Sequence, residues 1–499
     1  MSKDIDKKDS AKKMDGAHGE TDYIAQEDGR ESGGGKEMPF GWALFCIGFL
    51  LVSMVLSVLW LDIPIHINLL TSMAVTLGVA WLNGKKWDEI FSYIEYGGKV
   101  CIAPTLTMMI VGIVIGSWIA SGTVPMIIYW GLKMINPAIF LAAACVVCAI
   151  TSISTGSSWS TAGTVGIALM AVGGGLGINP AMTGGAIISG AYFGDKMSPM
   201  SDTTNLAPAV AEADIFDHIR SMVYTSGPAF LITLVFYGVL GLKYTGHNVD
   251  NEAIAATMES LKATFNLNPL VLLPPVIVIA MAVLQKPAIP TLLISSAVAG
   301  AMAMIFQGAS LTEITTIMDT GFKSETGIHD IDVLLSRGGL QSMLWTAALG
   351  MLGMLYGSIM EKSGLLEAFL KKMKLFTNTL GGLVTVVVLS CIILLAATAS
   401  QTLAIVVGGR MYISEFRKKN LLPQTLSRTL EDSGTIVSPL IPWSLCGVYM
   451  AGTLGVSTMS YLPFAIFCWI CPILAVIYGF TGKFFWKTGE KSSKRTYAE

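Results

Sequence analysis

The chain has 499 residues, of which 53% are hydrophobic and only 13% are charged. A soluble domain carries about 25% charged residues, so this composition excludes an ordinary soluble protein and indicates one that crosses a membrane several times. The net charge of -2 gives no sign of nucleic-acid binding, and no G-x-x-x-x-G-K-[ST] sequence is present that would imply ATP hydrolysis.

Residues 1–39 are expected to form a disordered tail. They are rich in charge, glycine and serine and almost free of aliphatic side chains, so burial cannot offset their ordering entropy. They lack the basic region, short apolar stretch and small-residue cleavage site of a signal peptide. The first apolar run is therefore expected to remain in the mature chain.

Eight apolar runs follow, each about long enough to span a hydrocarbon core roughly 30 Å thick. They cover 40–61, 65–83, 99–121, 217–243, 269–284, 288–306, 340–361 and 462–485. Two further apolar segments, 180–208 and 423–450, are interrupted by polar clusters. Two C-x-x-C pairs lie in apolar sequence and are expected to be buried thiols rather than redox or metal sites, namely Cys145/Cys148 and Cys468/Cys471.

The sequence repeats itself at a spacing of a little over 220 residues. The matching stretches are 69–75 with 292–298, 87–97 with 311–321, 110–117 with 351–358, and 198–199 with 438–439. These matches occur in the same order in both halves, with small gaps between them. The pattern therefore predicts a duplicated fold.

Each half also contains one segment that is apolar at both ends and polar in the middle, at 137–171 and 380–407. Non-helical backbone is tolerated at membrane depth only where it is buried or lines a cavity, which favours a re-entrant hairpin over two full crossings. The hairpin tips are expected to face the substrate or ion. Their residues are Thr155, Gly156, Ser157, Ser158, Thr398, Ser400 and Gln401.

We therefore predict an all-α polytopic membrane protein with two inverted repeats, each of about five transmembrane helices, one re-entrant hairpin and a broken helix at the midplane. Five crossings per repeat force the second repeat to be inverted. With the N-terminus inside, Lys and Arg concentrate in the cytoplasmic segments. The predicted parts are the tail 1–39, repeat 1 at 40–243, an extracellular connecting loop at 244–267, repeat 2 at 268–485, and a cytoplasmic C-terminal tail at 486–499.

The two interrupted segments carry charges that are unfavourable in a bilayer. A charged side chain at the bilayer centre costs at least about 2.5 to 3.5 kcal/mol, so an intramembrane carboxylate is a functional candidate. The expected ion and proton ligands are the carboxylates of Asp195, Asp202, Glu431 and Asp432, with further oxygens from Ser198, Ser201, Thr203, Thr204, Asn205, Thr435 and Ser438.

Two prolines are expected to open the helices beside these carboxylates. Pro199 and Pro439 lack an N–H, which is expected to free the carbonyls of Asp195 and Thr435 from helical bonding. Broken helices of inverted repeats place such carbonyls at the midplane, where they suit an alkali cation. Three glycines are expected to let the chain unwind there, namely Gly190, Gly194 and Gly434.

Na⁺ at Asp195 and Asp202 would compete with protons for the same site. Burial disfavours an ionised carboxylate, whereas a bound cation favours it. If only the loaded or protonated forms cross between inward and outward states, competition alone produces exchange.

Other charged residues have interpretations that compete with an ion-binding role. Asp195 and Lys196 could form a static ion pair, and Lys196 could equally replace the cation when the site is empty. His66 is expected to be a hydrogen-bonded packing residue, and 87–96 and 311–318 to lie along the interface as paired supports. A solvated cytoplasmic turn, with a funnel for incoming protons as the alternative, is expected from Asp214, Asp217, His218 and Arg220.

Two stretches resemble a known family. "GAIISGAYFGDKMSPMSDTTNLAPAV" (185–210) resembles the signature region of the NhaC-type sodium/proton antiporter family, in the ion transporter superfamily, and "EDSGTIVSPLIPW" (431–443) resembles its second-half counterpart. The similarity covers roughly residues 40–485. It implies a multi-pass bacterial plasma-membrane protein with cytoplasmic termini, a transporter rather than an enzyme, that exchanges Na⁺ for H⁺ without a cofactor. It also makes the four carboxylates named above the ion and proton residues.

The resemblance does not fix the substrate. The family includes members resembling malate/lactate exchangers and sodium-coupled amino-acid carriers, so Na⁺-coupled transport of a small organic acid or amino acid is the alternative function. The expected partners are membrane lipid, Na⁺ and H⁺, with an organic anion or amino acid under the alternative. A homodimer is left open.

Overall fold

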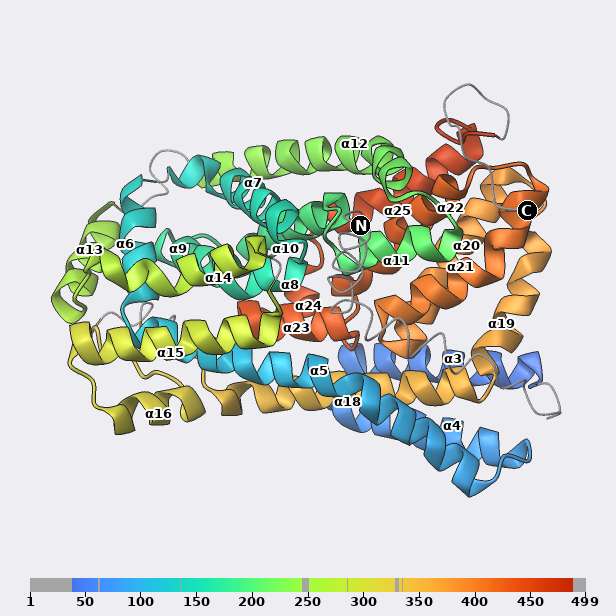
Figure 1. The fold of residues 1–499 in the computed structure, drawn as a ribbon, viewed down its shortest axis with the longest axis horizontal. Coiled ribbons are helices and arrows are strands. Elements are labelled where there is room, and N and C mark those ends of the chain that lie inside the picture. The colour runs from blue at the N-terminus through green and yellow to red at the C-terminus, as the bar shows by residue number, and fades with distance from the viewer. Residues whose placement is uncertain are drawn as a thin grey trace, which may run out of the picture.

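The computed structural model describes residues 38–487 except 62, 135, 245–250, 285, 328–331 and 334. The predicted tails, 1–39 and 486–499, therefore lie almost wholly outside the described residues. Within the described ranges every regular element is a helix (Figure 1), apart from one isolated bridge between Leu421 and Lys487. The all-α prediction is confirmed.

The described residues of the first half form ten α-helices. They are α3 (Phe40–Leu56), α4 (Ile65–Leu82), α5 (Trp87–Ala120), α6 (Thr123–Met134), α7 (Pro137–Thr155), α8 (Ser158–Thr161), α9 (Ile167–Gly175), α10 (Pro180–Met197), α11 (Asp202–Ala211) and α12 (Ile215–Gly241). A π-helical turn, η2 (Ala162–Gly166), joins α8 to α9.

The second half begins with α13 (Asn251–Thr264), which lies inside the predicted connecting loop. The helices after it are α14 (Leu273–Val283), α15 (Ala288–Gln307), α16 (Leu311–Thr320), α18 (Leu340–Lys362), α19 (Leu365–Met373), α20 (Leu380–Thr398), α21 (Gln401–Lys418), α22 (Pro423–Leu430), α23 (Leu445–Leu454), α24 (Thr458–Tyr461) and α25 (Ile466–Thr481). Between α22 and α23 lie a π-helical turn, η7 (Glu431–Thr435), and a 3₁₀ turn, η8 (Ser438–Leu440).

Seven helices of the described chain are long and apolar enough to cross a membrane, namely α4, α5, α7, α12, α15, α18 and α20. The number rises to nine if each of two bent pairs is one span, and the bent pairs are Ala255–Thr264 with Pro269–Ala282, and Pro423–Leu440 with Leu445–Leu454. Each of the eight predicted apolar runs coincides with a helix. The protein is therefore a polytopic membrane protein, while the count of ten crossings stays a prediction.

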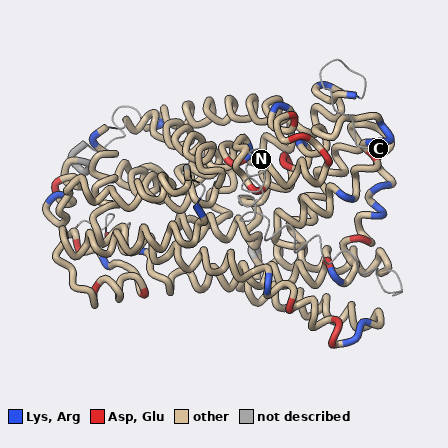
Figure 2. Tube along the Cα trace, viewed as in Figure 1, with Lys and Arg blue, Asp and Glu red and all other residues tan. Residues whose placement is uncertain are grey.

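Charged side chains are distributed as a bilayer requires. Figure 2 shows most Lys, Arg, Asp and Glu residues toward the two ends of the long axis, and few in the middle. An uncharged middle avoids the cost of placing ions in hydrocarbon. The few interior charges are consequently the ones that need a chemical explanation.

Two predicted interfacial segments differ in structure. Residues 87–96 begin α5, which runs for 34 residues, and are not a separate helix, so their place along the interface stays a prediction. Residues 311–318 do form a separate helix, α16, whose start is fixed by a capping box between Ser310 and Glu313. His66, as predicted, is a packing residue, because its Nε2 lies 2.9 Å from the carbonyl oxygen of Trp345.

Helix α10 packs closely against α7 because glycines face that contact. A Cβ at Gly190 would collide with the carbonyl of Cys145, and a Cβ at Gly194 would lie 2.5 Å from the Cβ of Ser152. Both glycines lie inside a regular helix, so the prediction that they unwind the chain is wrong, and their role is close approach. The C-x-x-C thiols are free and buried, as predicted.

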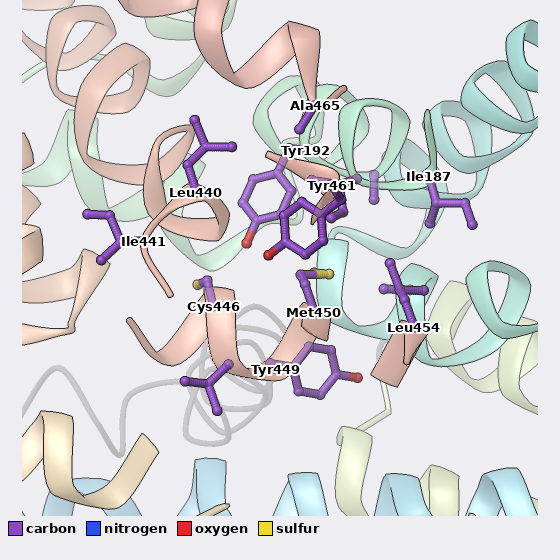
Figure 3. Close-up of a cluster of buried hydrophobic side chains, with 14 of the residues drawn as sticks. Ile187, Tyr192, Leu440, Ile441, Cys446, Tyr449, Met450, Leu454, Tyr461 and Ala465 are labelled. Atoms are coloured by element: carbon purple, nitrogen blue, oxygen red, sulfur yellow. The ribbon is translucent and has the colours of Figure 1, made fainter. Parts of the chain in front are cut away.

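A buried hydrophobic cluster joins α10 of the first half to the second half. Figure 3 shows Tyr192 of α10 beside Tyr461, with Met450 and Leu454 of α23 close by. The Tyr461 hydroxyl donates a hydrogen bond to the carbonyl of Pro439 at 2.5 Å. The two interrupted segments of the sequence thus share one core.

Candidate cation site

The first interrupted segment is a true break between two helices. Helix α10 ends at Met197, α11 begins at Asp202, and Pro199 lies between them. Ser201 caps α11 by accepting a hydrogen bond from the Thr204 N–H. Asp202 is the first residue of α11, at a helix N-terminus, which is a position that favours negative charge.

Asp195 points from the end of α10 to the break between α7 and α8. It is 6% exposed, and Ser158 donates both its backbone N–H, at 3.1 Å, and its hydroxyl, at 2.6 Å, to Oδ2. Because a carboxylate offers about four acceptor positions, Asp195 keeps capacity for a cation.

Gly156 shapes the break between α7 and α8 that brings Ser158 to Asp195. It adopts a φ of 67°, and a Cβ there would lie 2.7 Å from the backbone of Met200. Only glycine combines this backbone conformation with so close a contact. The break in α7 therefore packs directly on the break between α10 and α11.

A cavity of about 230 Å³ opens beside these two breaks. Its described lining residues are Thr107, Gly156, Ser157, Ser158, Trp159, Ser160, Gly163, Asp195, Ser201, Asp202, Thr203, Ala288, Leu292, Gln401 and Tyr449. None of them is Lys, Arg or His. Asp202 is exposed, and its carboxylate has no hydrogen bond or ion pair among the described residues. The cavity therefore presents two carboxylates that no basic lining residue neutralises.

The second pair of carboxylates lies in a closed environment. Lys196 forms an ion pair with Asp432, and both side chains are fully buried. Thr225 of α12 donates a hydrogen bond to Oδ1 of Asp432 at 3.0 Å. The alternative of a static Asp195–Lys196 pair is wrong. Successive residues on a helix point about 100° apart, so Asp195 reaches α8 while Lys196 reaches η7.

Glu431 lies between the closed pair and the cavity. It is fully buried, near Lys196, Thr203 and Asp195, and neither of its carboxylate oxygens has a hydrogen-bond partner in bonding geometry among the described residues. Thr203 also lines the cavity. Glu431 therefore lies between the Lys196–Asp432 pair and the cavity carboxylates.

Arg428 supplies a second buried cation on this side. It lies one helical turn before Asp432, is 1% exposed, and its guanidinium lies 4.9 Å from the ring centre of Phe485. Glu431 and Asp432 thus face two buried cations, Lys196 and Arg428. The sequence analysis missed Arg428, although its spacing of four residues from Asp432 was a usable signal.

The predicted solvated turn at the start of α12 is correct except for its histidine. Asp214 caps the helix, and half-buried Asp217 pairs with exposed Arg220 at 3.6 Å. His218 is fully buried, and its Nδ1 lies 2.8 Å from the hydroxyl oxygen of Ser427. The prediction failed there because position 218 is on the face of α12 that packs against α22.

The two carbonyls expected to be free have other partners. The Asp195 carbonyl accepts hydrogen bonds from the Thr204 hydroxyl at 3.1 Å and the Ser198 N–H at 3.2 Å. The Thr435 carbonyl accepts one from the Ser438 hydroxyl at 2.6 Å. The expectation of open carbonyls is therefore wrong, because each break carries its own hydroxyl cap.

Several predicted ligands serve the local backbone instead of the cavity. Three of them donate hydrogen bonds to backbone carbonyls: the Ser198 hydroxyl to Ile153, the Asn205 amide to Pro199, and the Thr398 hydroxyl to Leu394. The Ser400 side chain caps α21. The Thr155 hydroxyl lies 3.5 Å from the Ser157 carbonyl oxygen. Of the predicted tip at 398–401, only Gln401 lines the cavity.

The sequence analysis missed an aromatic wall of the cavity. Trp159 and Tyr449 stack at 4.1 Å between ring centres with planes 9° apart, and the Tyr449 hydroxyl donates to the Trp159 carbonyl at 2.9 Å. Trp159 could have been noticed as the aromatic residue within the polar tip. Tyr449 had no such signal, because it comes from α23, 290 residues later.

Membrane-length helices around an acidic cavity define a polytopic membrane protein with charged groups at breaks in its spans. The described residues contain no group of three or more His, Cys, Asp or Glu side chains arranged to hold a metal ion. The sequence model of the Na⁺/H⁺ antiporter family matches residues 190–483, which include both breaks. The chain belongs to this family, a family of transporters, as the resemblance of its motifs indicated.

Named relatives cover nearly the whole chain. It is 36% identical to the Na⁺/H⁺ antiporter NhaC of Alkalihalophilus pseudofirmus, over 90% of this chain and 96% of that protein. It is also 36% identical to the malate-2H⁺/Na⁺-lactate antiporter of Bacillus subtilis, over 90% and 96%. The arginine/ornithine antiporter ArcD of Halobacterium salinarum is 36% identical, over 92% of this chain and 96% of that protein.

Proposed function

We propose that this protein exchanges Na⁺ for H⁺ across the membrane by alternating access. The observation that carries the proposal is the acidic cavity, which Asp195 and Asp202 line without a basic neighbour among the lining residues. Carboxylate, hydroxyl and amide oxygens around it are suitable ligands for Na⁺. Since protons bind to the same carboxylates, the two ions compete.

Glu431 and Lys196 adjust the charge around this site. Lys196 is held by Asp432, and Glu431 lies near both Lys196 and Asp195. A cation that arrives at Asp195 weakens the repulsion between Asp195 and Glu431. The ionised form of Glu431 is thereby favoured when Na⁺ binds.

The proposed architecture has two inverted repeats, each with one re-entrant hairpin. The order of elements supports it, because α3, α4, α5, α7, α10 and α12 have counterparts, in the same order, in α14, α15, α18, α20, α22 and α25. The contacts are also reciprocal, since α4 packs on α18 while α15 packs on α5. The hairpins are then α7 with α9, and α20 with α21.

We place the protein in a bacterial plasma membrane with both ends of the chain in the cytoplasm. Basic residues concentrate where α4, α19 and α21 end, namely Lys85, Lys86, Lys371, Lys372, Arg417, Lys418 and Lys419. Loops rich in Lys and Arg stay on the cytoplasmic side. Figure 2 shows this asymmetry between the two ends of the molecule.

The test is reconstitution of the purified protein in vesicles that contain a pH-sensitive dye. A Na⁺ pulse should change the internal pH without any organic solute. The half-maximal Na⁺ concentration should fall as pH rises, because fewer protons compete. Strict dependence of the signal on an added solute would instead establish the alternative, Na⁺-coupled transport of an organic acid or amino acid.

That alternative is favoured by the relatives, because the malate/lactate and arginine/ornithine antiporters match this chain as closely as the NhaC relative does. Against it, none of the described residues lining the cavity is a Lys, Arg or His that could receive a carboxylate. Na⁺/H⁺ exchange is therefore the function that the cavity supports best.

A further inference from the structure

The cavity is larger than Na⁺ alone needs and smaller than a pocket for a drug-sized ligand. Pockets for drug-sized ligands measure about 300 to 1,000 Å³, and this one measures about 230 Å³. A single Na⁺ ion would leave most of that volume free for several further atoms or water molecules. The dimensions therefore fit a compact molecule of a few heavy atoms.

One wall of the cavity is aromatic and held in place. The stacked rings of Trp159 and Tyr449 are fixed by the hydrogen bond from the Tyr449 hydroxyl to the Trp159 carbonyl. A Cβ at Gly163 would lie 2.7 Å from that hydroxyl, so the glycine makes room for it. Trp159 is half-buried whereas Tyr449 is buried, so Trp159 is the more accessible ring. Aromatic faces attract cations.

The charges of the cavity restrict the class of ligand further. A carboxylate on the ligand would meet Asp195 and Asp202 with no lining Lys, Arg or His to receive it. Like charges at such a site are repelled, so a dicarboxylate or a zwitterion fits this lining less well than a cation does. Ala288 and Leu292 add an apolar wall that a bare metal ion does not need.

We propose that the cavity also binds a compact monovalent organic cation, of the guanidinium or methylammonium class. Its charged group is held by Asp195 and Asp202, and its face or methyl group contacts Trp159. The proposal rests on the proposed function, because the same two carboxylates hold Na⁺, and the organic cation and Na⁺ therefore compete.

The test is calorimetric binding of millimolar guanidinium to the purified wild-type protein in Na⁺-free buffer, with lactate as the anionic control. We expect guanidinium to bind, lactate not to bind, and added Na⁺ to displace guanidinium. Trp159→Leu should weaken guanidinium binding about 2- to 30-fold, the range expected for loss of a cation–π contact. Trp159→Phe keeps an aromatic face and should weaken it less.

Three results would overturn the inference: no guanidinium binding to a protein that exchanges Na⁺, binding of lactate in preference to guanidinium, or equal weakening of Na⁺ and guanidinium by Trp159→Leu. The proposed exchange is tested separately by the Na⁺-driven pH change in vesicles without guanidinium. Guanidinium binding without such a pH change would refute the exchange and leave the organic-cation site intact.

Discussion

The two helix breaks of this protein contain the same kinds of residue and differ in their access to the cavity. Each has a proline, Pro199 or Pro439, and a hydroxyl that caps a backbone carbonyl, from Thr204 or Ser438. At the first break Pro199, Asp202 and Asn205 are exposed. Around the second break, all residues from 421 to 441 are buried.

This difference in access is matched by a difference in charge. The carboxylates of the first break, Asp195 and Asp202, line the cavity without a basic lining residue beside them. Those of the second break, Glu431 and Asp432, lie close to Lys196 and Arg428. A buried charge without a partner is unfavourable, so the second break is balanced internally. Under the proposed function, the first break gains its balance when a cation binds.

The largest expected effect comes from breaking the closed ion pair. Removing one member of a buried pair costs about 3 to 5 kcal/mol, whereas replacing both members is often neutral. We therefore expect Lys196→Met and Asp432→Asn to lower thermal stability strongly in detergent, and the double variant to recover most of the loss. A double variant no more stable than the single ones would show that the pair does not balance the second break.

Replacing the cavity carboxylate should instead affect binding. Loss of one member of a buried charge pair weakens binding by about 2 to 5 kcal/mol, which is about 30-fold or more in affinity. We expect Asp195→Asn to weaken Na⁺ binding by that factor and to remove Na⁺-driven pH changes in vesicles, with little loss of stability. Glu313→Gln is the matched control, because Glu313 caps the distant helix α16. Normal exchange by Asp195→Asn would contradict the assignment.

The sequence predicted the parts of this comparison that depend on local composition. Apolar runs located the helices, because a span needs a fixed length of apolar sequence. Prolines and carboxylates within those runs located both breaks. The hydroxyl caps, such as Thr204 on the Asp195 carbonyl, were not foreseen, because a polar residue at a break can serve the backbone as well as a ligand.

The features that the sequence could not predict depend on contacts between residues far apart in the chain. Lys196 and Asp432 are 236 positions apart, and only the packing of α10 on the second half joins them. The burial of His218 likewise depends on α22. In a sequence, a glycine that unwinds a helix looks the same as one that allows two helices to pack closely. The structure shows close packing at Gly190 and Gly194.

A smaller effect is expected from removing one hydroxyl group that donates a hydrogen bond to a carboxylate at each break. Hydrogen bonds to charged groups are worth about 1.5 to 3 kcal/mol. Ser158→Ala removes a donor that favours ionised Asp195, so protons should compete better, and the pH of half-maximal exchange should rise by about one unit. Thr225→Val removes the donor to Asp432 and should lower thermal stability without moving that pH. Equal shifts of the pH profile in both variants would remove the distinction between the breaks.

The smallest effect should come from the glycine beside each break. A Cβ at Gly194 would meet the backbone of Ala149 and Ile153 as well as Ser152, and such overpacking costs about 1 to 3 kcal/mol. At Gly434 the nearest atom is Cγ1 of Ile405, at 3.1 Å, which a flexible side chain can withdraw.

We therefore expect Gly194→Ala to lower both thermal stability and Na⁺ affinity, because α10 moves away from α7 and Asp195 moves away from Ser158. Gly434→Ala should change both less. Gly98→Ala in α5, where nothing lies within 4 Å, is the control and should not destabilise the protein, since alanine favours a helix more than glycine does. The methyl group added at Gly434 leaves α10 and Asp195 undisturbed. If Gly434→Ala nevertheless lowered Na⁺ affinity more than Gly194→Ala, the cation would have to be assigned to the second break.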